Sequence, residues 1–250
     1  MNIDIQQYFI TRWEKYFPDS ELPICYYYTD HLSEMDPLEN SAAARCLIGN
    51  LGRVREGETF IYHKESGGCS GGKRYSGFDP QIRPDFEYFL SCGIPGQVEG
   101  ERYKKTPELV REHVKNHPPF EAPGQYLVFK RWDKLNQNEQ PVAVIFFATP
   151  DVLAGLFTLA NFDRADSLGV FTPMGAGCAT LINYPMEESR TENPRCILGM
   201  FDVSARPHVP EKTLTFSIPI NRFQQMVYHM DESFLITESW IRVKRRLKND

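Results

Sequence analysis

Residues 141–149, PVAVIFFAT, constrain the fold of this chain more than any other stretch. They are apolar at both alternating positions of an extended strand, so other parts of the chain must cover both faces of that strand. We therefore place this strand in the centre of a sheet. Helices and strands interleave along the chain, but the last strands follow one another directly. This order predicts an α+β fold with a mixed β-sheet flanked by helices.

The other elements are predicted from hydrophobic periodicity and from turn and cap residues. Further strands are predicted at residues 23–29, 59–63, 124–132, 177–185, 195–203 and 213–220. Helices are predicted at residues 5–17, 42–55 (capped by Asn40 or Ser41), 106–117, 150–162, 220–230 and 238–250. Residues 144–157 and 214–227 share a strand, a proline and a helix, which indicates either two similar strand–helix units or a chance likeness.

Composition limits the classes of function. The 250 residues are enough for a sizeable core, and we expect a single domain over residues 1–250. The net charge of −5 argues against a nucleic-acid partner, which requires a basic face. No apolar run is long enough to span a membrane, and the first residues do not resemble a secretory signal. We therefore expect a cytoplasmic protein.

Three of the six cysteines stand in settings that suit a site, whereas a free cysteine is most often a small buried apolar residue. Cys46 is predicted to face away from the apolar stripe of its helix, beside Asn50 and Arg53. Cys178 follows Gly175 and Gly177, and glycine lets a ligand or another backbone come close. Both cysteines are therefore candidate site residues.

The third cysteine, Cys69, lies in a glycine-rich segment, SGGCSGGKRYSGF, over residues 66–78. Glycines leave backbone amides uncovered, so such a loop suits an anion or the sulfide of a cluster. Basic neighbours favour the thiolate form of a cysteine. The other interpretation is a glycine-rich turn with an incidental cysteine. The candidate ligand-binding residues of this segment are Gly67, Gly68, Gly71, Gly72, Lys73 and Arg74.

These motifs, in this order, resemble domain-of-unknown-function family 169, an uncharacterised archaeal and bacterial family. The resemblance includes the cysteine on an early helix, the CSGG loop, the FATP strand–helix unit and the later CA pair, and it covers residues 23–230. It implies that Cys46, Cys69 and Cys178 fall where family members also place cysteines. Many members carry a further cysteine where this chain has Met200 and Val203, and Cys196 lies only just upstream.

Three functions stay open from the sequence. The first is an iron–sulfur cluster or other metal on Cys46, Cys69 and Cys178, with an open position for a small anionic ligand. Arg53, Asn50, Lys73, Arg74 and Arg206 would then orient that ligand. The second is a small-molecule binding module that uses the cysteines as neutral lining. The third is a thiol-dependent enzyme at Cys69, for which His63 is the only nearby histidine.

Overall fold

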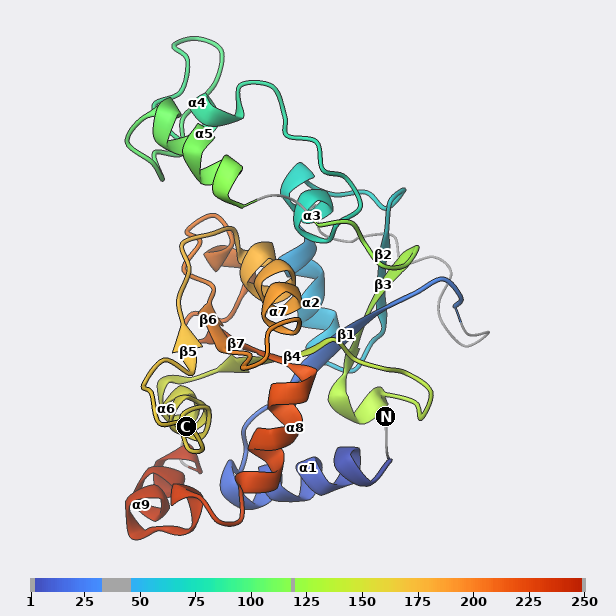
Figure 1. Ribbon diagram of the computed structural model, residues 1–250, viewed down its shortest axis with the longest axis vertical. Helices are drawn as coiled ribbons and strands as arrows, with labels where there is room; N and C mark the ends of the chain where they lie inside the picture. Colours follow the sequence, from blue (N-terminus) through green and yellow to red (C-terminus); the bar gives the residue numbers. More distant parts are fainter. Residues whose placement is uncertain (1–2, 33–45, 118–119, 249–250) are drawn as a thin grey trace.

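Seven strands form one sheet in the order β2–β3–β1–β4–β7–β6–β5 in a computed structural model of the chain, which describes residues 3–32, 46–117 and 120–248 (Figure 1). The strands are β1 (Ile24–Thr29), β2 (Phe60–His63), β3 (Tyr126–Arg131), β4 (Ala143–Ala148), β5 (Val170–Phe171), β6 (Cys196–Gly199) and β7 (Leu214–Pro219). The pair β5–β6 is parallel and the other neighbours are antiparallel. The predicted α+β fold with a mixed sheet is confirmed.

The helices are of very different lengths. They are α1 (Ile3–Tyr16), α2 (Leu47–Arg55), α3 (Ser70–Tyr75), α4 (Phe86–Phe89), α5 (Pro107–Asn116), α6 (Pro150–Leu159), α7 (Tyr184–Glu188), α8 (Ile220–His229) and α9 (Glu238–Leu247). Short helical turns occur at η1 (Trp132–Lys134), η2 (Ala179–Asn183), η3 (Arg206–His208) and η4 (Phe234–Ile236), of which η2 is a π-helix.

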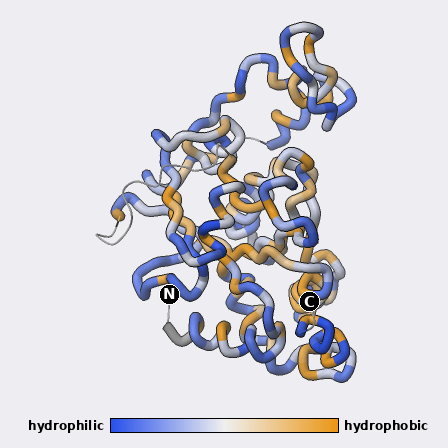
Figure 2. Tube along the Cα trace, turned by 180° about the vertical axis from the view of Figure 1, so that it is seen from behind, coloured by the Kyte–Doolittle hydropathy of each residue, from blue (hydrophilic) through white to orange (hydrophobic). Residues whose placement is uncertain are grey.

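Strand β4 lies in the middle of the sheet and is buried along its whole length, as its sequence predicts. Val144 and Phe146 pack into one hydrophobic core, whereas Ala143 and Ile145 pack into a second core on the opposite face. Because successive side chains of a strand point to opposite faces, one apolar strand serves both cores. Figure 2 shows hydrophobic stretches running through the middle of the molecule.

Different helices cover the two faces of the sheet (Figure 1). The core of the first face takes Phe9 and Trp13 from α1, Leu156 from α6, Phe223 from α8 and Trp240 from α9. The core of the second face takes residues of α2, η2 and α7. Helices α4 and α5 lie apart from both layers, on an excursion of the chain between β2 and β3 (Figure 1).

The likeness between residues 144–157 and 214–227 corresponds to two adjacent strand–helix units. Strands β4 and β7 pair antiparallel, with Ala143 opposite Pro219 and Ala148 opposite Leu214. Each strand leads into a helix, α6 or α8, and both helices pack on the first face. That the two units arose by duplication stays a prediction.

The strand predicted at residues 177–185 is wrong, because this segment is helical over η2 and α7. Every residue from Gly177 to Met186 is buried, so no polar face marks the helical period. A short apolar run of this kind does not distinguish a strand from a buried helix. Pro185 sits in the first turn of α7, where a missing amide hydrogen costs little.

The helix predicted at residues 42–55 is observed from Leu47 onward, and its predicted first residues and cap lie outside the described residues. Within the part of the chain that the structure describes, no helix has the length and apolar character to cross a bilayer.

Candidate functional site

A cavity of about 510 Å³ lies between the elements on the second face of the sheet and the excursion that carries α4 and α5. Its inner end is lined by residues of α3 and by residues next to α2 and η2, and its outer end by residues of the excursion. All three cysteines singled out from the sequence line this one cavity, although they lie up to 132 positions apart in the chain, from Cys46 to Cys178.

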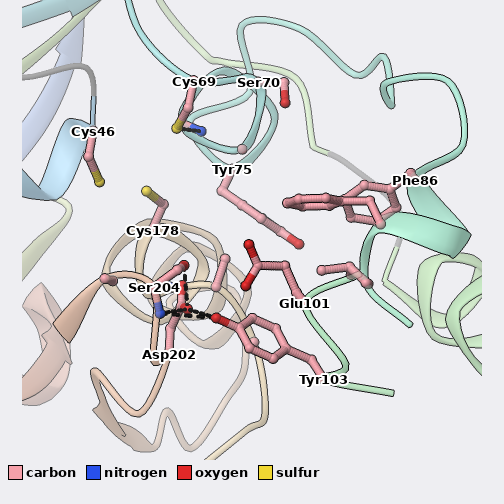
Figure 3. Close-up of a pocket in the computed structure, with 18 of the residues that line it drawn as sticks. Cys46, Cys69, Ser70, Tyr75, Phe86, Glu101, Tyr103, Cys178, Asp202 and Ser204 are labelled. Carbon is pink, nitrogen blue, oxygen red and sulfur yellow. Dashed lines mark hydrogen bonds between the residues drawn. The ribbon is translucent and has the colours of Figure 1, made fainter. Parts of the chain in front are cut away.

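Each of the three cysteines stands at the start of a helical segment. Cys46 is the residue before α2, Cys69 is the residue before α3, and Cys178 is the residue before η2. The Cys69 sulfur accepts a hydrogen bond from the backbone amide of Gly72 (3.3 Å). Figure 3 shows the three sulfur atoms pointing toward one shared space at the inner end of the cavity.

Glycines permit the close approach of backbones at this end. A Cβ atom on Gly177 would lie 3.1 Å from the Ala205 Cβ and 3.3 Å from the Met200 sulfur. The Gly177 amide donates to the Asp202 carboxylate (2.9 Å), which also accepts from the Ser204 hydroxyl (2.8 Å). These contacts hold the loop after β6 against the turn that carries Cys178, so the position of this cysteine depends on both segments.

Burial keeps two of the thiols protonated. It raises the pKa of Cys178 well above the ordinary value of a thiol, and negative charge on Cys69, Cys46 or Asp202 would raise this pKa further. Burial also raises the pKa of Cys46, although the backbone amides of Gly49 and Ile48 act in the opposite direction. Any ligand that binds these two sulfurs as thiolates must therefore displace protons.

The outer end of the cavity combines aromatic and charged side chains (Figure 3). Aromatic rings come from Tyr75, Phe86, Phe89 and Tyr103, and charged or titratable groups come from Arg83, Glu101, Lys104, His113 and Asp202. None of these residues was predicted from the sequence, because most of them come from the excursion, which has no recognisable motif, and Tyr75 and Asp202 come from α3 and the loop after β6. Asp202 lies in the segment where the family resemblance suggested a further cysteine, and its carboxylate lines the cavity there.

The structure divides the candidate ligand-binding residues into two groups. Gly68, Gly71 and Gly72 line the cavity, whereas Gly67 is exposed outside it. The segment is only partly a loop, because α3 begins at Ser70. Asn50 is buried beneath the site, and its side-chain amide donates to the Cys46 carbonyl (3.2 Å).

None of the four basic residues proposed to orient an anion lines the cavity. Arg53 forms an exposed ion pair with Glu58, and the Lys73 ammonium donates to the carbonyls of His63 (2.8 Å) and Lys64. The remaining two, Arg74 and Arg206, donate to backbone carbonyls: Arg74 to Pro80 and His117, Arg206 to Glu211 and Thr213. Arg83 and Lys104, from the excursion, are the basic residues in the lining.

The other cysteines lie elsewhere. Cys25 and Cys196 are buried in the core of the first face, where the Cys196 sulfur lies 3.8 Å from the Met226 sulfur, and Cys92 is exposed. Cys196 therefore lies on the opposite side of the sheet from Cys178 and does not supply a fourth thiolate. In residues 3–32, 46–117 and 120–248, no three His, Cys, Asp or Glu side chains are arranged to hold one metal ion.

Comparison with known proteins agrees with this arrangement of motifs. The profile of DUF169, described as "Uncharacterised ArCR", matches residues 19–229. The chain belongs to the DUF169 family. No curated protein and no solved structure matches it. The DUF169 match spans every element from β1 to α8, so it includes the core of the second face and the whole lining of the cavity, whereas α1 and α9 on the first face lie outside it.

Proposed function

We propose that this DUF169 protein holds an iron–sulfur cluster on Cys46, Cys69 and Cys178, and that one iron of the cluster faces the outer end of the cavity to bind a small anionic ligand. The observation that carries the proposal is the convergence of three thiols from separate elements at one end of one cavity. Cysteine thiolates are the usual ligands of such clusters.

In this proposal the three thiols hold a cluster and not a single metal ion. The described residues hold no group of three ligands placed for one metal ion, yet the three sulfurs face one space. A cluster separates its cysteine ligands more widely than one ion does, because irons and sulfides lie between them. The Gly72 amide already donates to the Cys69 sulfur (3.3 Å), and backbone N–H groups of this kind tune such clusters.

The outer end of the cavity suits a small anion with an apolar part. Lys104 and Arg83 both line this end, and the Arg83 guanidinium stacks on the Phe89 ring at 4.5 Å. Phe86 and Tyr75 supply apolar surface next to these cations. A negatively charged molecule that reached the open iron would therefore meet these two cations and apolar walls, in a lining that also holds the carboxyl groups of Glu101 and Asp202.

Anaerobic purification followed by an absorption spectrum and iron and sulfide analysis tests the cluster. We expect iron, sulfide and a visible absorption band, each lost in Cys46→Ser, Cys69→Ser and Cys178→Ser. Cys92→Ser is the matched control, because Cys92 is exposed outside this cavity. A wild-type protein that takes up no iron and sulfide under reconstitution would contradict the proposal, as would three cysteine variants that retain the full cluster.

A second function, binding of a small organic molecule without a cluster, is favoured by one observation. The volume of about 510 Å³ lies in the range of small-molecule sites, and burial keeps the Cys46 and Cys178 thiols neutral. This function predicts ligand binding that survives replacement of all three cysteines by serine. The thiol-enzyme alternative at Cys69 is less favoured, because His63, the base considered for it, does not line the cavity.

A further inference from the structure

Tyr62, on β2, carries a buried hydroxyl group without a hydrogen-bond partner among the described residues. The side chain is 2% exposed, and its ring packs between Phe60 and Phe78, with ring centroids 6.2 and 6.0 Å away. A phenylalanine would fill the same space without burying a polar atom. Buried hydroxyls are nearly always paired in folded proteins, so this one calls for an explanation.

Neighbouring tyrosines in the same core are satisfied. The Tyr26 hydroxyl donates to the Ile182 carbonyl (3.1 Å), and the Tyr28 hydroxyl donates to the Ser76 carbonyl (2.9 Å). The second core therefore provides partners for the hydroxyls of Tyr26 and Tyr28 but not for that of Tyr62.

The Tyr62 hydroxyl lies beside Gly72, on the side of the cavity that carries Cys69. A Cβ atom on Gly72 would lie 3.1 Å from the Tyr62 oxygen and 3.5 Å from the Cys69 sulfur, so both atoms border the space that glycine leaves open. Burial raises the pKa of Tyr62, and negative charge on Cys69, Cys178 and Cys46 would raise it further. All three thiols are thus close enough to act on this phenol electrostatically.

A protonated thiol is a weak hydrogen-bond acceptor, whereas a thiolate or a cluster sulfide carries negative charge and accepts more strongly. The hydroxyl group would therefore gain a partner when the sulfurs bind metal. We propose that Tyr62 is a positioning residue whose hydroxyl group donates a hydrogen bond to a cysteine or cluster sulfur in the loaded site. This inference rests on the proposed function.

The test is Tyr62→Phe, with Tyr26→Phe as the matched control, in apo and cluster-loaded protein. In the apo protein, Tyr62→Phe should not lower the unfolding midpoint, because no bond is lost, whereas Tyr26→Phe should lower it. In the loaded protein, Tyr62→Phe should shift the midpoint potential to more negative values, because a hydrogen bond to sulfur stabilises the reduced cluster. Loss of the cluster to a chelator should accelerate about 10-fold to 100-fold, the usual cost of a removed outer-shell partner.

Electron–nuclear double resonance on the reduced cluster tests the proposed hydrogen bond directly. One exchangeable proton coupled to the cluster should disappear in Tyr62→Phe and persist in Tyr26→Phe. If the wild-type protein loads but Tyr62→Phe keeps its potential, chelator resistance and coupled proton, the Tyr62 inference is wrong and the cluster stands. If the wild-type protein does not load at all, the proposed function itself is wrong. An equal change in both variants would also overturn the role of Tyr62.

Discussion

Gly71 and Gly72 are adjacent residues of α3 with different surroundings. A Cβ atom on Gly71 would have no neighbour within 4 Å, whereas one on Gly72 would press on the Tyr62 hydroxyl at 3.1 Å. The sequence marks both as candidate ligand-binding residues, but it does not indicate which glycine is required by the close packing around it.

Gly71→Ala should therefore stabilise the protein by up to about 1 kcal/mol, the usual gain of alanine over glycine in a helix. Gly72→Ala should be about 1–3 kcal/mol less stable than Gly71→Ala, because its methyl group is overpacked against a ring held by its neighbours. Urea unfolding of the two variants measures this difference. Equal stability of the two would show that the Tyr62 ring moves aside freely.

The Cys178 thiol makes the free energy of unfolding depend on pH. Burial raises its pKa in the folded protein above the ordinary 9.0 of the unfolded chain, so the folded state favours the protonated thiol. The resulting stabilisation is complete below pH 9 and is lost as pH rises from there toward the raised folded-state pKa.

The apo protein should therefore lose free energy of unfolding as the pH rises above about 9, and Cys178→Ala should lose less over the same interval. Cys92→Ala is the control, since Cys92 is exposed and its replacement should leave the pH dependence unchanged. An identical pH dependence in Cys178→Ala and the wild type would contradict the burial of this thiol.

At the scale of elements, α6 and α8 are joined by a buried arginine. The Arg222 guanidinium donates to both carboxylate oxygens of Asp163 (2.5 and 2.8 Å) and to the Ala160 carbonyl (3.0 Å) at the end of α6. Arg222 is 3% exposed, whereas Asp163 is partly exposed. The guanidinium lowers the pKa of Asp163, so this contact contributes stability that is lost in acid.

Arg222→Ala should destabilise the protein by about 2–3 kcal/mol, toward the low end for a broken buried pair because Asp163 retains some solvent. Arg53→Ala is the comparison, since the Arg53–Glu58 pair is exposed on α2. We expect no measurable change in unfolding for Arg53→Ala, because exposed ion pairs contribute little. A similar loss in both variants would mean that Arg222 does not join the two helices.

Over the whole molecule, buried contacts are distributed unevenly. Every residue of β4 is buried, whereas α4 has no buried residue and α5 has only Val110. The outer end of the cavity is therefore lined by segments with few buried residues, whereas Cys178 at the inner end belongs to the fully buried residues 177–186.

Hydrogen exchange should reflect this difference. The amides of β4 should exchange only through global unfolding, and those of α4 and α5 should exchange much faster through local opening. A small anion that binds the outer end should slow exchange in α4 and α5 while leaving β4 unchanged. Protection of α4 equal to that of β4 would contradict this account.

The sequence alone was sufficient to predict the fold class, the central place of β4 and most helices, because burial on one or both faces imposes a period on the residues themselves. It also selected Cys46, Cys69 and Cys178 from their local settings. It was wrong about residues 177–185, because a segment buried on every side has no polar face to reveal its period.

Only the tertiary structure decided which contacts the candidate site residues make. The cavity is closed by α4 and α5, which carry no motif, and the directions of Arg53, Lys73, Arg74 and Arg206 are determined by carbonyls and carboxylates that fold against them. The Tyr62 hydroxyl and the Cys69 sulfur border the same space because Gly72 has no side chain to fill it. The hydrophobic period of a segment indicates which side of the helix or strand is buried. Which residues pack against that side depends on segments far away in the sequence.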